Sequence, residues 1–149
     1  AEPLHQIAKI HRLNGNPNLG YLFAKQALEI PYPKNDILFI SDHVYTWMIL
    51  DEFASTAYYI GDYHNGREAV LTLIKLLNDG KVPEEHRQRF IDNLNYYEAA
   101  IKKENVDKEA FLKEKSESES LIKKKKMQKK KSMQAKKNKK NKKKKKSKV

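Results

Sequence analysis

Residues 47–77 read WMILDEFASTAYYIGDYHNGREAVLTLIKLL and divide into two amphipathic halves at Gly61-Asp62. Apolar or small side chains recur at helical spacing in both halves: Leu50, Phe53, Ala54, Ala57 and Ile60, then Ala69, Val70, Leu73, Ile74 and Leu77. The pattern predicts two antiparallel helices closed by a tight turn. A helix pair of this kind cannot bury its apolar faces alone, so we expect neighbouring hairpins.

A second hairpin is expected upstream, with helices from Pro3 to Leu13 and from Asn18 to Ile30. The turn between them, Asn14-Gly15-Asn16-Pro17, offers a glycine for a positive φ, an N-cap and a proline for the first helical turn. The second of these helices is expected to bury Leu19, Leu22, Phe23, Ala27 and Leu28. In the connector 31–42, the apolar run Ile37–Ile40 is expected to pack on the core, with a binding role as the alternative.

The two hairpins align at an offset of 46 residues, an internal repeat read directly from the sequence. The matched pairs are Leu4 with Leu50, Ile7 with Phe53, Ala8 with Ala54, Gly15 with Gly61, Gly20 with Gly66, and Ala27 with Leu73. Bulky, small and glycine positions follow the order typical of tetratricopeptide repeats, whose usual period is about 34 residues. We expect the connector 31–42 to absorb the excess length.

Beyond Gly80 the repeat becomes degenerate. Pro83-Glu84-Glu85 is expected to open a fifth helix, with Phe90, Ile91, Leu94, Tyr97 and Ile101 as its apolar stripe. A sixth helix is expected from Asp107 to Leu121, pairing loosely with the fifth and capping the array. The predicted domains are therefore 1–104, tetratricopeptide-like; 105–122, a charged helix or cap; and 123–149, a disordered polylysine tail.

Charge is distributed unevenly along the chain. The whole chain has a net charge of +12, but residues 123–149 hold 17 lysines and no acid, which leaves residues 1–122 with a net charge of −5. The tail has almost nothing to bury, so we expect it to be disordered. Its partners would be nucleic acid or another anionic surface, bound weakly and without sequence specificity; the alternative is a solvated tail without a binding role. We expect a cytoplasmic protein, or a nuclear one if import machinery reads the tail.

Several runs of residues resemble a known family. They are Tyr21–Lys34 (YLFAKQALEIPYPK), Val44-Tyr45, Leu50-Asp51-Glu52 and Ala57–Gly61. Residues 2–97 resemble the tetratricopeptide-like region C-terminal to the catalytic domain of family-2-type glycosyltransferases. That catalytic domain carries an Asp-x-Asp metal motif, and this chain contains no Asp-x-Asp. The resemblance therefore implies the helical appendage and no transferase activity.

The repeat alignment selects a candidate groove for a protein or peptide. Its positions are His5, Lys9, Arg12, Asp51, Ser55, Tyr58 and Tyr59. Tyrosine and arginine are frequent binding hot spots, although Tyr58 and Tyr59 could instead pack between repeats, as could the doublet Tyr96-Tyr97. Asp51 is expected to face the groove, and its neighbour Glu52 to be more peripheral.

Neither catalytic residues nor metal ligands are expected, and no cofactor is implied. The five histidines show no metal-binding spacing, and His11 is expected to be a packing residue. The carboxylates Asp51 and Glu52 point in different directions on a helix, so they do not form an acid–base pair.

The sequence thus predicts an all-α fold, a tetratricopeptide-like array of five or six helices with a disordered Lys-rich tail. An irregular helical bundle is the competing architecture. We expect a non-catalytic interaction or scaffold module. The alternative is a fragment of a glycosyltransferase whose catalytic domain lies upstream.

Overall fold

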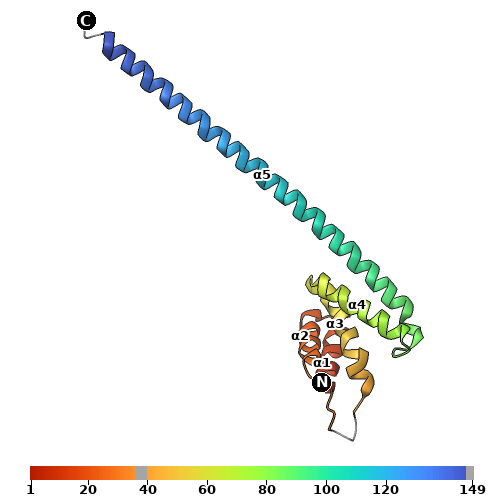
Figure 1. Cartoon of the computed structure of the whole chain (residues 1–149). Helices are drawn as coiled ribbons and strands as arrows, with labels where there is room; N and C mark the ends of the chain where they lie inside the picture. Colours follow the sequence, from red (N-terminus) through yellow and green to blue (C-terminus); the bar gives the residue numbers. More distant parts are fainter. Residues whose placement is uncertain (36–39, 147–149) are drawn as a thin grey trace. The chain divides into compact units, whose positions relative to one another are not determined.

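The computed structural model describes residues 1–35 and 40–146, and these residues form an all-α fold (Figure 1). The α-helices are α1 (Glu2–Leu13), α2 (Pro17–Leu28), α3 (Ile49–Ala57), α4 (Tyr63–Asn78) and α5 (Arg87–Lys146). A π-helical segment, η1 (Val44–Met48), precedes α3. Two 3-10 helices, η2 (Tyr58–Ile60) and η3 (Glu84–His86), precede α4 and α5. The chain divides into an N-terminal unit, Ala1–Lys103, and a C-terminal unit, Glu104–Val149.

Glycines with positive φ end three helical segments of the N-terminal unit. Gly15, Gly61 and Gly80 have φ angles of 74°, 80° and 71°, which a residue with a Cβ adopts only under strain. Asn16 and Pro17 occupy the N-cap and the first position of α2, as their types predict. The expected helix boundaries near these turns are confirmed.

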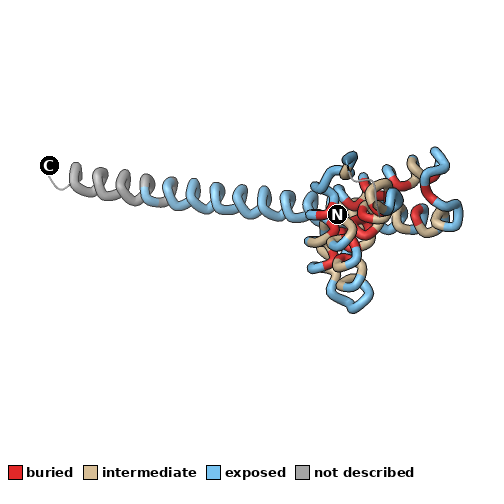
Figure 2. The backbone as a smooth tube through the Cα atoms, turned by 90° about the horizontal axis from the view of Figure 1, so that it is seen from below, coloured by how far each residue is buried: buried red, intermediate tan, exposed pale blue. Residues whose placement is uncertain are grey.

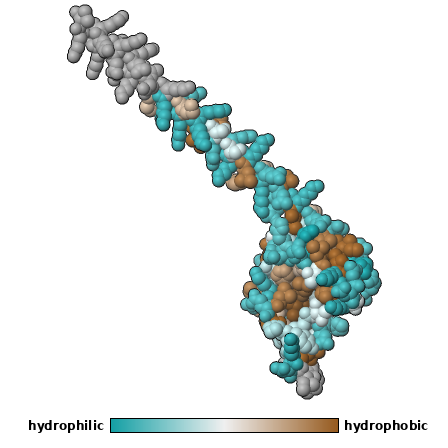
Figure 3. Space-filling model, viewed as in Figure 1, coloured by the Kyte–Doolittle hydropathy of each residue, from teal (hydrophilic) through white to brown (hydrophobic). Residues whose placement is uncertain are grey.

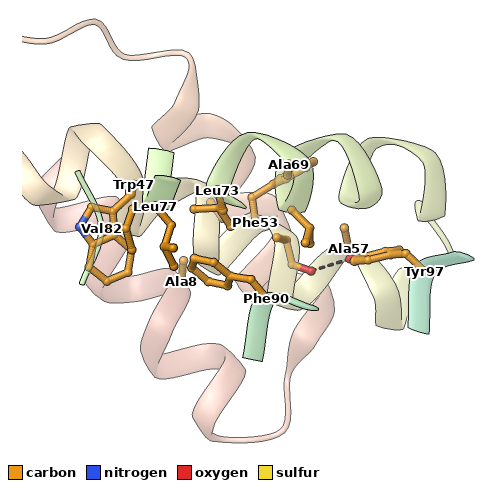
Figure 4. Close-up of a cluster of buried hydrophobic side chains, with 13 residues drawn as sticks. Ala8, Trp47, Phe53, Ala57, Ala69, Leu73, Leu77, Val82, Phe90 and Tyr97 are labelled. Carbon is orange, nitrogen blue, oxygen red and sulfur yellow. Dashed lines mark hydrogen bonds between the residues drawn. The ribbon is translucent and has the colours of Figure 1, made fainter. Parts of the chain in front are cut away.

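The helices of the N-terminal unit pack in chain order. α1 lies against α2, α2 against α3, and α3 against α4. Their shared core runs from Trp47, Leu77 and Val82 at one end to Tyr97 and Ala57 at the other (Figure 4). The start of α5 completes this core, because Phe90 and Tyr97 are buried in it. The apolar stripes predicted for α3 and α4 are confirmed as core-facing.

The prediction that the leucines of α2 are buried was wrong. Gly20, Ala24 and Ala27 face the core, whereas Leu19, Leu22 and Leu28 are 44%, 47% and 42% exposed. A Cβ added at Gly20 would lie 3.0 Å from Thr56 Cγ2 and 3.1 Å from the Ala8 carbonyl oxygen. The small residues let neighbouring helices approach closely, and this close approach turns the leucines outward. Figure 3 shows apolar surface on the outside of the N-terminal unit.

A separate sixth helix is also absent from the described residues. Residues 87–146 belong to the single helix α5, with no break near residue 102. No glycine or proline follows Pro83 in the sequence, and Glu, Lys and Ala favour helix, so nothing ends α5 there. In the fifth-helix stripe, Ile91 is exposed rather than buried.

Side chains of the C-terminal unit are described up to residue 130 and at Met133. Those from 105 to 130 are all exposed, in contrast to the buried residues concentrated in the N-terminal unit (Figure 2). The described lysines from residue 123 onward are therefore all exposed. This exposure is consistent with the disorder predicted for the tail. Of the run Ile37–Ile40, expected to pack on the core, residues 37–39 lie outside the described residues, and Ile40 is half-buried.

Candidate functional site

A hollow of about 770 Å³ lies on the N-terminal unit between α1, α3 and α5. We call it the tyrosine hollow. Its lining comes from α1, the following turn and the first residue of α2 (Arg12, Gly15, Pro17), from α3 and η2 (Ala54, Ser55, Tyr58, Tyr59), and from α5 (Arg89, Asn93, Tyr96, Tyr97). The helices α1, α3 and α5 are each the first helix of one of the predicted repeat units.

Tyrosine rings form one wall of the hollow. The ring of Tyr58 lies within 5.6–6.4 Å of the rings of Tyr63, Tyr96 and Tyr97, and 5.9 Å from that of Tyr59. Tyr59 and Tyr96 are 69% and 62% exposed, and Tyr58 is 37% exposed. The contacts of Tyr58 with Tyr59, Tyr96 and Tyr97 are edge-to-face, a favourable geometry for aromatic rings.

Tyr97 supports this wall from the core, where its ring contacts the ring of Tyr58. It is buried, and its hydroxyl donates a hydrogen bond to the Ala54 carbonyl oxygen at 2.5 Å, drawn as a dashed line in Figure 4. A Cβ added at Gly66 would lie 2.3 Å from Tyr97 Cζ, so the glycine on α4 makes room for the ring. Burial raises the pKa of the Tyr97 hydroxyl, which stays protonated.

Arg12 reaches the hollow from the end of α1. Its Nε and Nη2 donate to Oε2 and Oε1 of Glu52 at 2.6 and 2.9 Å. The hydrogen bonds with Glu52 raise the pKa of Arg12. Glu52 is buried, so the prediction that it lies more peripherally than Asp51 was wrong. The helices α1, α2 and α4 all contact α3, so the buried face of α3 is wide and includes Glu52.

Arg89 makes the equivalent pair from α5. Its Nη1 and Nη2 donate to the two carboxylate oxygens of Asp51 at 2.7 and 2.9 Å. Adjacent carboxylates on α3 therefore hold two arginines from two different helices. In both pairs the carboxylate side chain is less exposed than the guanidinium, 6% against 31% and 15% against 41%. The hollow thus presents the cationic partner of each pair.

The predicted groove residues separate into two groups. Arg12, Ser55, Tyr58 and Tyr59 line the tyrosine hollow together. His5 does not, because it is buried with 1% exposure, and burial lowers its pKa. Lys9 is half-buried on α1 outside the lining, and Asp51 acts through Arg89. The repeat alignment pairs His5 with Asp51, but the two side chains differ in the structure, because His5 is buried and Asp51 forms an ion pair with Arg89.

Arg89 and Asn93 line the hollow and were missed by the sequence analysis. The available signal was spacing: Arg89, Asn93, Tyr96 and Tyr97 fall at i, i+4, i+7 and i+8 and so share one face of α5. The tyrosine doublet was noticed, but the polar residues before it were not connected to it.

The lining of the tyrosine hollow offers hydrogen-bond donors, hydrogen-bond acceptors and aromatic contact. No cluster of three or more potential metal ligands occurs in the part of the chain that the structure describes. His11, predicted to pack, is half-buried and stacks on Phe23 with ring centroids 5.6 Å apart. Among the described helices, none is both long and apolar enough to cross a membrane.

Comparisons with protein-family models, with curated proteins and with solved structures find no match to this chain. Any functional conclusion therefore rests on the residues themselves and on their geometry.

Proposed function

We propose that the N-terminal unit is a non-catalytic interaction module that binds an extended peptide segment of a partner protein in the tyrosine hollow. The observation that supports this most is the composition of the lining. Three exposed or partly exposed tyrosines and two arginines converge on one hollow from α1, α3 and α5. Tyrosine and arginine dominate binding hot spots because they combine large contact area with directional hydrogen bonds.

Pre-organisation favours binding by this surface. The arginines are held by Glu52 and Asp51, and the tyrosine rings by one another and by Tyr97. Side chains already fixed in place lose little conformational entropy when a partner arrives. The amide of Asn93 can pair with a peptide backbone, and the hydroxyls of Ser55 and Tyr59 can donate or accept. These groups suit an extended segment with exposed backbone.

Peptide selection tests this function. A random peptide library would be panned on the immobilised full chain, and hydrogen exchange of the chain would then be compared with and without the enriched peptide. We expect slower exchange at the end of α1, in the second half of α3, and between Arg89 and Tyr97. Protection confined to α2 or to the C-terminal unit would contradict the proposal.

The C-terminal lysine run supports a second, auxiliary role as an attachment to anionic surfaces such as nucleic acid. Residues 123–149 contain 17 lysines and no aromatic residue, so stacking on bases is not available to them. We expect duplex DNA of any sequence to bind the full chain with an affinity that falls steeply with salt. Deletion of residues 123–149 should remove this binding, and binding that survives the deletion would exclude the role.

The alternative function is that of an accessory helical region within a longer glycosyltransferase. The exposed leucines of α2, Leu19, Leu22 and Leu28, favour it, because a further domain could cover them. A coding sequence that continues upstream into a domain with Asp-x-Asp would support this alternative. A start codon immediately before Ala1 would contradict it.

A further inference from the structure

Three serines alternate with glutamates on the surface of α5, in the stretch KEKSESESL over residues 113–121. The Oγ atoms of Ser116, Ser118 and Ser120 each donate to the carbonyl oxygen three residues earlier, at 2.8, 2.7 and 2.8 Å. All three serines are exposed. The hydrogen bonds described for these hydroxyls stay within α5, and the side chains are accessible to an enzyme from solvent.

The charges around the three serines differ. Ser116 has a carboxylate two residues before it, at Glu114, and carboxylates one and three residues after it, at Glu117 and Glu119. All three glutamates are exposed. Ser120, in contrast, is followed by Leu121 and Ile122 and then by four lysines. Serine kinases select substrates by this pattern of flanking charge.

We propose that Ser116 is a phosphorylation site for an acid-directed serine kinase. Ser116 Oγ would attack the γ-phosphorus of ATP, and the bond from that phosphorus to the β,γ-bridging oxygen would break. ADP leaves, and the hydroxyl proton passes to the kinase base. The product is a phosphoserine on the helix surface.

Accessibility of the local backbone supports this assignment. Kinases bind their substrates in extended form, so a helical serine is modified only if its helix opens at low cost. The described side chains from 105 to 130 are all exposed, so no burial of apolar surface opposes opening around Ser116. The hydrogen bond from Ser116 to Lys113 is lost on opening, but water replaces it.

The charge added by one phosphate is small beside that of the lysine run. A phosphoserine carries about −1.5 to −2 at neutral pH, against 17 lysines from residue 123 onward. One phosphate therefore deepens the acidic character of residues 104–122 without neutralising the lysine run. The test accordingly measures phosphate at a residue, and it does not depend on the peptide-binding or anion-binding roles.

The experiment incubates the full chain with ATP and an acid-directed serine kinase, and it locates phosphate by mass spectrometry. We expect phosphate at Ser116, with an initial rate lowered at least about tenfold in Glu119→Lys, which keeps the serine but reverses the charge three residues after it. Glu109→Lys, which makes the same change of charge seven residues before the serine, is the matched control and should leave the rate nearly unchanged. Equal rates in wild type and Glu119→Lys, or phosphate mainly at Ser120, would overturn the proposal.

Discussion

Arg12 on α1 and Glu52 on α3 form a two-pronged ion pair, with Nε–Oε2 and Nη2–Oε1 distances of 2.6 and 2.9 Å. Glu52 is buried, and Arg12 supplies both hydrogen bonds that the structure gives to its carboxylate oxygens. The pair joins two helices through residues that are 40 apart in the sequence. Arg12 thus has two roles: it borders the tyrosine hollow, and it neutralises a buried charge.

The first prediction follows from this second role. Arg12→Ala would leave Glu52 buried without its counter-charge, and we expect a loss of about 2 kcal/mol or more in the free energy of unfolding. Chemical denaturation followed by Trp47 fluorescence measures it. Arg67→Ala is the matched control, because Arg67 pairs with the exposed Glu68 and Glu98, and it should cost less than about 1 kcal/mol. Equal costs for the two variants would contradict the assignment.

A second prediction concerns the contact of Gly66 with Tyr97. Gly66→Ala would improve helix propensity by about 1 kcal/mol, but its Cβ would collide with the buried ring of Tyr97. We expect net destabilisation of about 1–3 kcal/mol, as found for overpacked cores. The same glycine substitution in a Tyr97→Leu background should cost much less, which a double-mutant cycle by denaturation would show. Identical costs in the two backgrounds would mean that the collision does not occur.

The buried His5 predicts a pH dependence. Burial lowers the pKa of His5 below the ordinary value of about 6.5. The negative charges of Glu52 and Asp51 oppose this shift, and the positive charge of Lys9 adds to it. Below about pH 6.5 the unfolded chain therefore binds a proton that the folded chain does not. The free energy of unfolding should fall between about pH 7 and pH 5, by at most about 1.4 kcal/mol per pH unit from this group.

His5→Gln tests that dependence, because glutamine is polar but does not titrate. Urea denaturation of both proteins across this pH range should give a flatter slope for the variant. Gln6→Ala, which changes an exposed residue of α1 that does not titrate, is the control and should keep the wild-type slope. Parallel slopes for wild type and His5→Gln would show that His5 is not the group responsible.

The lysine-rich end of α5 gives a fourth prediction. Its lysines repel one another, and the described side chains from residue 123 onward are exposed, so little burial stabilises helix there. We expect its helix content at low ionic strength to be small and to rise when salt or heparin screens the repulsion. Far-ultraviolet circular dichroism of the full chain, minus that of a chain ending at residue 122, measures this. A difference spectrum that is fully helical at low salt would contradict the predicted disorder.

The sequence predicted the helices but not every face that they bury. Turns at Gly15, Gly61 and Gly80 were predictable because a positive φ favours glycine at a helix end. The outward leucines of α2 were not, since hydrophobicity alone ranks Leu19 above Gly20 as a core residue. Only the close approach of Ala8 and Thr56 explains why the glycine faces inward.

The site was predicted in part for a similar reason. Tyr58 and Tyr59 stand out by type, and they do line the hollow. Which of Asp51 and Glu52 is more deeply buried depends on the width of the buried face of α3. That width is set by the several helices that pack against α3. Arg89 and Asn93 share a helix face with Tyr96 and Tyr97, but they lie 30 or more residues from Tyr58 and Tyr59, and no local pattern connects them to that pair.

Peptide binding in the tyrosine hollow can be tested by one comparison of affinities. Calorimetric titration of a library-selected peptide into the full chain would be repeated with Tyr59→Ala and Tyr96→Ala. Both side chains are largely exposed, so their loss should not unfold the chain. Tyr32→Ala removes another exposed tyrosine outside the hollow and serves as the control. We predict at least about a tenfold rise in Kd for the first two variants, or about 1.4 kcal/mol each, and no change for the control. Unchanged affinity in Tyr59→Ala and Tyr96→Ala would contradict the account.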